Sequence, residues 1–276
     1  MIGVGLLVGG CGGSSAKSGN RGAERVVAGF YPLAFAAEEV GGAAVDVTNL
    51  TPPGVEPHDL EISPKQVEEV RSADLVLLLG HGFQPQVEDA AGSGSKVVKL
   101  LDLPGLGRFP NSDPHVWLDP RRYALIVRRI GVALHARPAA RRLASRLHAL
   151  DAEYRRGLAR CKRRDVVTSH EAFGYLAQRY KLHQIAITGL APEAEPTPGA
   201  LEHAVAAVRA SRATTIFLEP LVSPRIADTV ARETGTRTAV LDPIEALTPD
   251  EAERGADYFS LMRSNLAELR RALGCR

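Results

Sequence analysis

Three histidines and one aspartate, spread through the chain, are the residue types of a metal site. The histidines are His58, His115 and His170, and the aspartate is Asp242. Successive members lie between 55 and 72 residues apart, so no single helix or loop can hold them together. Three imidazoles and one carboxylate suit a borderline-soft divalent ion such as zinc. If these side chains share a site, the fold must assemble it.

The elements that would assemble this site alternate between strands and helices. Short apolar runs rich in β-branched residues predict buried strands at 25–30, 45–50, 73–79, 96–101, 165–168, 184–187, 214–218 and 238–241. Helical patterns separate most of them, at 32–40, from Ser63 onward, and at 172–180, 201–211, 224–234 and 258–273. Strands that alternate with helices predict βαβ units and parallel sheets, so the fold class is α/β.

Residues 120–160 interrupt this alternation with two helical patterns and no strand. Leu143, Leu147, Leu150, Tyr154 and Leu158 recur at helical spacing on one face. We predict that residues 138–160 form a long rigid backbone helix between two similar α/β lobes. The N-terminal lobe would span 24–137 and the C-terminal lobe 161–276. The alternative is an amphipathic helix inside a single domain.

The four candidate ligands fall on loops beside predicted strand ends or helix starts. His58 follows the second strand, and His115 lies in a proline-bounded loop just before the central helices. His170 and Asp242 directly follow the first and last strands of the second lobe. Open α/β sheets bind ligands outside the carboxyl ends of their strands. Two candidates from each lobe are therefore expected to meet in one interlobe cleft.

Each of these residues also has an ordinary structural interpretation. A lone histidine is most often a surface or hydrogen-bonded residue, and we interpret His135, His148, His183 and His203 in that way. Asp242, which precedes Pro243, also suits a turn or cap. Glu219 follows a strand as well, and we rank it below Asp242, as an ion-pair or cap residue.

Composition limits the class of protein. The chain has 276 residues, 45% hydrophobic and 24% charged, with a formal net charge of +2. The hydrophobic content is enough to build a core, and it excludes disorder for the main body of the chain. The positive and negative charges are too balanced to indicate nucleic-acid binding. We also expect the protein to be a monomer. The sequence has no phosphate-binding GxxxxGK[ST] loop, so any ATPase activity belongs to another chain.

The N-terminal segment resembles a secretory signal with a lipoprotein cleavage site. Residues 1–10 are apolar, and Cys11 is followed by a Gly/Ser-rich tether. The run is shorter than the roughly 20 residues that a membrane-spanning helix needs. It departs from a secretory signal in one respect, because no Lys or Arg precedes the apolar residues. We expect residues 1–23 to be signal and tether, with Cys11 lipidated and the protein held outside the cytoplasm. Cys161 and Cys275 then remain, and the sequence leaves open whether they pair.

Four motifs in this order resemble those of a known family. They are EPHDLE at 56–61, DPHVWLDP at 113–120, SHEAFGYL at 169–176 and LDP at 241–243. Together they resemble the metal-binding solute-binding proteins of zinc and manganese ABC importers, the zinc-uptake lipoprotein family. The likeness extends over residues 24–276. The motif around His115 is its most specific part.

The resemblance implies a metal-capturing protein that is not an enzyme. It implies two α/β lobes joined by a rigid helix, with the ion held by His58, His115, His170 and Asp242. It implies delivery to a permease and its ATPase from the periplasm or the cell surface. An imidazole at the third ligand position accompanies zinc in this family, whereas a carboxylate there accompanies manganese. His170 therefore favours zinc. The short segment Phe109–Ser112 lacks the His-rich loop of many zinc members, so manganese and iron remain alternatives.

Two readings from other classes remain open at this point. One is a zinc hydrolase that uses His58, His115 and His170 as ligands and Glu171 as base. A carboxylate in the fourth coordination position would exclude it, because a catalytic zinc keeps that position for water. The other is an adhesin whose metal is structural. If the protein serves transport, release of the metal ion requires either opening of the lobes or movement of the Asp242 loop.

Overall fold

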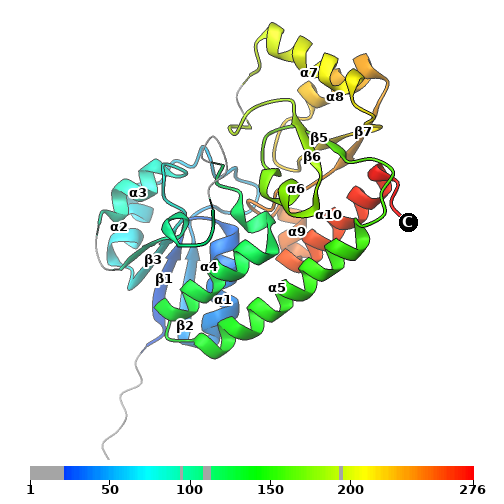
Figure 1. The fold of residues 1–276 in the computed structure, drawn as a ribbon. Coiled ribbons are helices and arrows are strands. Elements are labelled where there is room, and N and C mark those ends of the chain that lie inside the picture. The colour runs from blue at the N-terminus through cyan, green and yellow to red at the C-terminus, as the bar shows by residue number, and fades with distance from the viewer. Residues whose placement is uncertain (1–21, 94–95, 108–112, 193–194) are drawn as a thin grey trace, which may run out of the picture.

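The computed structural model describes residues 22–93, 96–107, 113–192 and 195–276. They form two four-stranded parallel sheets (Figure 1). The first has the order β2-β1-β3-β4, with β1 (Glu24–Ala28), β2 (Val45–Asn49), β3 (Leu75–Leu78) and β4 (Val97–Lys99). The second has the order β6-β5-β7-β8, with β5 (Asp165–Thr168), β6 (His183–Ala186), β7 (Thr215–Leu218) and β8 (Arg237–Val240). The predicted α/β class is confirmed, and both halves share one strand order.

The outer face of each sheet packs against its own pair of helices. Val70 of α2 (Pro64–Ser72) and Val87 of α3 (Pro85–Ala91) join one hydrophobic cluster with β1 and β3. Val208 of α7 (Pro198–Ala210) and Val230 of α8 (Arg225–Thr234) join a second cluster with β5 and β7. The inner strand β3, which has helices on both faces, is continuously apolar and all four of its residues are buried.

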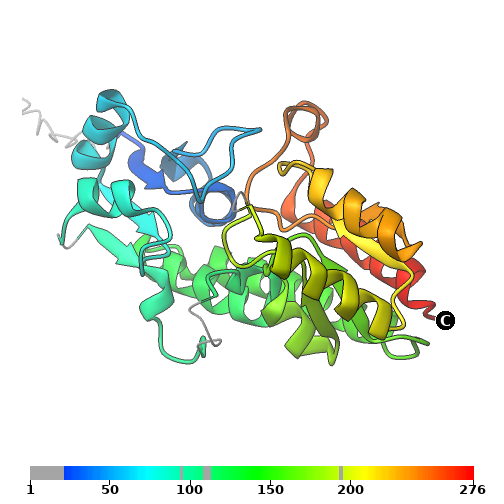
Figure 2. The same ribbon diagram turned by 90° about the horizontal axis from the view of Figure 1, so that it is seen from above.

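The inner faces of both sheets share one hydrophobic core. This cluster joins Leu77 of β3 to Phe217 of β7 through five other helices. These are α1 (Tyr31–Gly41), α4 (Pro120–Ala133), α5 (Arg137–Gly157), α6 (Gly174–Tyr180) and α10 (Tyr258–Leu273). Helix α5 is the backbone helix predicted at 138–160, and it runs along both halves (Figures 1 and 2). The exact division into lobes at residues 137 and 161 stays a prediction.

Local capping explains where several helices begin. Ser63 caps α2 through a reciprocal pair of hydrogen bonds with Gln66, and Asp257 caps α10 in the same way with Ser260. Asp119 caps α4 by accepting from the Arg121 amide. The prediction missed α3 and α9 (Pro249–Glu253), because α3 buries only Val87 and α9 buries no residue, so neither shows an apolar periodicity.

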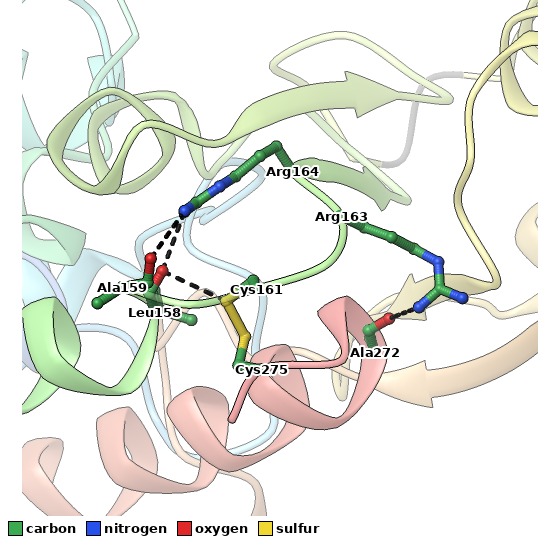
Figure 3. Close-up of a disulfide and its surroundings, with 7 residues drawn as sticks. All are labelled: Leu158, Ala159, Cys161, Arg163, Arg164, Ala272 and Cys275. Atoms are coloured by element: carbon green, nitrogen blue, oxygen red, sulfur yellow. Dashed lines mark hydrogen bonds between the residues drawn. A yellow bond between two sulfur atoms is a disulfide. The ribbon is translucent and has the colours of Figure 1, made fainter.

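A disulfide joins Cys161 to Cys275 (Figure 3). The two Cα atoms lie 3.8 Å apart across 114 residues of chain. The bond fixes the end of α10 to the segment that follows α5. The Arg163 amide reinforces this junction by donating to the Leu273 carbonyl at 3.1 Å. The pairing that the sequence left open is therefore present.

The predictions for the N-terminal segment and Cys11 concern residues outside those described. Within the described ranges, no helix combines the length and the apolar character needed to cross a membrane.

Candidate metal centre

The structure brings the three predicted histidines together from three separate loops. His58 lies between β2 and α2, His115 directly precedes a 3-10 turn (Val116–Leu118) before α4, and His170 follows β5. Their ring centroids are 5.2 to 6.2 Å apart. The Nε2 atoms of His115 and His170 approach within 3.3 Å. The first half therefore contributes two imidazoles and the second half one.

The fourth member of the group is Glu245. Its Oε1 atom lies 2.8 Å from Nε2 of His115, 3.2 Å from that of His58 and 3.7 Å from that of His170. One ligand atom from each of the four residues lies within 4.8 Å of all the others. In a tetrahedral zinc site with bonds of about 2.0–2.1 Å, ligand atoms are about 3.3 Å apart. The separations of 2.8, 3.2, 3.3 and 3.7 Å lie close to that value, so the four atoms are near enough to share one ion.

Asp242, the carboxylate predicted from sequence, is not a member of this group. One of its carboxylate oxygens accepts from the Ile244 amide at 2.7 Å, and the other is buried with no hydrogen-bond partner among the described residues. Ile244 has a φ of 57°, so the chain turns sharply between the two acidic residues. This turn, which no sequence pattern announced, brings Glu245 to the imidazoles. The expected loop therefore places a carboxylate beside the imidazoles, but from a position three residues later.

The loop that carries Glu245 is fastened on two sides. Trp117 Nε1 donates to the Pro243 carbonyl at 2.7 Å, which links this loop to the motif of His115. The side chain of Asn265, on α10, accepts from the Asp242 amide at 2.9 Å and donates to its carbonyl at 2.6 Å. All these groups are buried. The position of Glu245 is therefore set by buried hydrogen bonds from both halves.

Two further carboxylates orient the buried imidazoles. Asp113 Oδ1 lies 2.7 Å from Nδ1 of His115, and Glu219 Oε2 accepts from Nδ1 of His170. A hydrogen bond at Nδ1 fixes the ring and leaves the Nε2 lone pair for an ion. Glu219, predicted as an ion-pair or cap residue, thus supports His170. Asp113 lay in the motif, but sequence reasoning gave it no role. Glu171, the base of the hydrolase reading, is not in the ligand group.

The electrostatics of the group favour a cation. Burial alone would lower the pKa of His115, but hydrogen bonds to Asp113 and Glu245 raise it to about 10. Burial would raise the pKa of Glu245, but hydrogen bonds to His115 and His58 hold it well below the usual value. Without an ion, a proton on His115 therefore supplies the positive charge that the carboxylates require.

Burial differs among the four side chains. His115 and His170 have no exposed side-chain surface, and Glu245 has 2%. The His58 side chain is 14% exposed. Within the described structure, solvent reaches the ligand group beside His58.

Comparison with known proteins agrees with these motifs. The family model described as zinc-uptake complex component A, periplasmic (ZnuA) matches residues 26–272. The zinc-binding lipoprotein AdcA of Streptococcus pneumoniae serotype 4 (strain ATCC BAA-334 / TIGR4) is 33% identical over 89% of this chain. The chain spans only 55% of that relative's length. The high-affinity zinc uptake system protein ZnuA of Bacillus subtilis (strain 168) is 31% identical over 97% of this chain and 94% of its own.

Two solved structures share the fold. The Zn(II)-bound ZnuA-like domain of Streptococcus pneumoniae AdcA matches with a TM-score of 0.77 and 32% identity, over 91% of this chain and 99% of the domain. The laminin-binding protein Lmb of Streptococcus agalactiae, described as a bifunctional protein with adhesin and metal transporting activity, matches with a TM-score of 0.83 and 29% identity. That match covers 91% of this chain and all of Lmb.

The resemblance drawn from the four motifs is therefore confirmed. The matching family consists of extracytoplasmic solute-binding components of transport systems, not of enzymes. The match covers nearly the whole described chain and includes all four residues of the ligand group. The chain belongs to the family of the periplasmic component A of zinc-uptake complexes.

Proposed function

We propose that this protein captures a zinc ion outside the cytoplasm and delivers it to the permease of an ABC importer, whose ATPase supplies the energy. One observation carries the proposal: three imidazole Nε2 atoms and Glu245 Oε1 converge from both halves within 4.8 Å of one another. A shell closed by four protein ligands is typical of binding, whereas a catalytic zinc keeps a position for water. The hydrolase reading is disfavoured for that reason.

The donor set supports zinc over manganese. Imidazole suits zinc, whereas manganese prefers a shell rich in carboxylate and carbonyl oxygens. Three of the four proposed ligand atoms are nitrogen, and only Glu245 supplies oxygen. The zinc named in the descriptions of the AdcA and ZnuA relatives supports the same choice. Since raw affinity ranks copper higher, selection among ions rests on geometry and on which metal is available.

The way the halves are joined bears on release. One hydrophobic cluster passes through the inner faces of both sheets, so separating the lobes would expose part of it. The Glu245 loop is held by buried hydrogen bonds. His58 is the one proposed ligand with a side chain open to solvent. We therefore propose that the permease triggers release by displacing His58, in place of lobe opening or movement of the Asp242 loop.

Attachment to a membrane through lipidated Cys11 is part of the proposal. Its support is the apolar run before Cys11, the Gly/Ser tether after it, and the lipoprotein description of the AdcA relative. We propose that the protein acts as a monomer on this tether, at the cell surface or in the periplasm. Metabolic labelling with a fatty acid, compared between the wild type and Cys11→Ser, tests the anchor.

Competitive metal loading tests the function. The metal-stripped protein is titrated with zinc and manganese, followed by elemental analysis and by the fluorescence of Trp117, whose ring centroid lies 5.1 Å from that of His115. We expect one zinc per chain that excess manganese does not displace. Glu245→Gln should lose it, whereas the matched control Glu171→Gln should retain it. Preferential manganese retention, or equal binding by both variants, would refute the assignment.

A further inference from the structure

A second site lies among α4, α5 and α6, away from the ligand group. It is a surface depression of about 330 Å³, and none of the four proposed zinc ligands lines it. Its polar lining is entirely basic: Arg121, Arg122, Arg128, Arg179 and His148. Four guanidinium groups around one small depression create a strong positive potential. The zinc-capture function gives no use for this concentration of charge.

Two arginines at the floor of the depression, Arg122 and Arg179, are held by contacts with the protein. Asp119, which is fully buried, accepts from Arg122 Nη1 at 2.7 Å and from Arg179 Nη2 at 2.7 Å. Arg122 also donates to the Leu106 carbonyl, and its guanidinium lies 4.8 Å from the Tyr175 ring centroid. These contacts hold two guanidinium groups in place before any ligand arrives, which lowers the entropic cost of binding. One carboxylate neutralises only one of their two charges.

The rim of the depression carries charge without a counter-ion. Arg121 and Arg128 lie seven residues apart on one side of α4, and within the described residues their guanidinium groups form no hydrogen bond or ion pair. Partial burial and the charges of Arg121 and Arg128 lower the pKa of His148. The nearby carboxylate of Asp151 is engaged by Arg155 at 3.1 Å. The rim therefore presents at least two unbalanced positive charges.

The placement of these arginines opposes the usual preference of a helix. The N-terminus of an α-helix is its positive end, where acidic side chains are favourable. The first turn of α4 contains Arg121 and Arg122 and no acidic residue. The N-cap carboxylate of Asp119 offsets part of this repulsion, but Arg122 and Arg179 already engage it, so a bound anion would offset the rest.

We propose that this depression binds a phosphate group, either as the free ion or as the headgroup of an anionic lipid. Arginine forks match the oxygens of phosphate with paired charge-assisted hydrogen bonds. A charge near −2 balances the excess on the rim, and the volume accommodates one phosphate with some of its water. Arg121 and Arg128 would close over the group, while Arg179 would contact it from the floor.

The first experiment measures inorganic phosphate. The full chain is used without metal, because phosphate complexes zinc. It is titrated with phosphate by calorimetry at constant ionic strength. The test variant is Arg121→Gln with Arg128→Gln. Its matched control is Arg212→Gln with Arg254→Gln, which removes the same charge from two exposed arginines outside the depression. We expect phosphate binding that weakens at least tenfold in the test variant alone, with stoichiometric zinc binding kept in both.

The second experiment separates the two sources of phosphate. Sedimentation with vesicles of phosphatidylglycerol is compared with vesicles of phosphatidylcholine for the same two variants. Binding of free phosphate without vesicle binding assigns the site to the ion. Vesicle binding that is lost only in the Arg121/Arg128 variant assigns it to a lipid headgroup. Absence of both, or equal losses in the two variants, would overturn the proposal.

Discussion

The loops that carry His58 and Glu245 approach the same point from opposite halves, but they are held differently. The Glu245 loop is buried and is fastened by Trp117 and Asn265. Residues 52–55 of the other loop are exposed, and one backbone bond, from the Gly54 amide to the Leu247 carbonyl at 2.7 Å, ties this stretch to the second half.

The histidines reflect the same contrast. His115 and His170 are buried, and each has a carboxylate at Nδ1. His58 is partly exposed, and its ring rests on Phe83 with centroids 4.8 Å apart. The proposed site therefore has a buried inner wall of His115, His170 and Glu245, and a partly exposed outer wall formed by His58. A transport protein needs both properties, because it must bind selectively and still release its cargo.

The largest expected effect tests this contrast directly. Zinc binding to protein sites of four ligands is worth about 10–16 kcal/mol, so one ligand accounts for about 3 kcal/mol. We expect His115→Ala to weaken zinc about 1,000-fold, because it removes both a ligand and the imidazole that Asp113 and Glu245 share. His58→Ala should cost less, about 10–100-fold, since water can replace an exposed ligand. Competition with a zinc chelator measures both.

Circular dichroism of the metal-free variants serves as the control for folding. Equal losses for the two substitutions, with both variants folded, would remove the distinction between the inner and outer walls.

The proton on His115 gives the next effect. Because two carboxylates raise the pKa of this imidazole to about 10, it is protonated at pH 7 in the metal-free protein and must lose that proton to bind zinc. Apparent zinc affinity should therefore rise with pH between 7 and 9, about tenfold per unit for one proton released. Calorimetry in buffers of different ionisation enthalpy counts the proton. An affinity independent of pH in this range would contradict the assignment.

The hydrogen bond from Trp117 to the Glu245 loop predicts a smaller effect, on both stability and zinc affinity. Trp117→Phe keeps the aromatic ring but removes the donor to the Pro243 carbonyl. A buried acceptor left without its partner costs about 1–3 kcal/mol. We expect a loss of this size in the free energy of unfolding, measured with urea on the metal-free protein, and zinc binding weakened by up to about tenfold. Unchanged stability would show that the Asn265 contacts hold the loop alone.

Sequence reasoning named three of the four residues that the structure gathers into one group, and it did not name the fourth, whose position depends on one turn. His58, His115 and His170 were identifiable because each lies beside an element that apolar periodicity reveals. The choice between Asp242 and Glu245 depends on the backbone at Ile244, where φ is positive. No periodic pattern encodes that angle, since Ile rarely adopts it. The pairing of Cys161 with Cys275 was undecidable for a related reason: it requires the distance between two segments 114 residues apart.

The smallest expected effect separates the two carboxylates of the Glu245 loop. Burial raises the pKa of Asp242 to about 8 despite a hydrogen bond from the Ile244 amide. A folded-state pKa above the unfolded value of about 3.9 means that this group destabilises the protein progressively as pH rises between the two values. Asp242→Asn keeps the acceptor for the Ile244 amide and removes the ionisation.

For Asp242→Asn we therefore expect zinc affinity within about threefold of the wild type, since a side chain outside the ligand group contributes little beyond holding the loop. At pH 9 the free energy of unfolding of the metal-free protein should be equal to or above that of the wild type, whereas the difference should shrink as the pH falls to about 4. A large loss of zinc in this variant, with Glu245→Gln retaining it, would restore Asp242 as the ligand. That result would also make the inner wall the mobile one. The Asp242 carboxylate could reach the ion only if the loop that Trp117 holds through the Pro243 carbonyl rearranged.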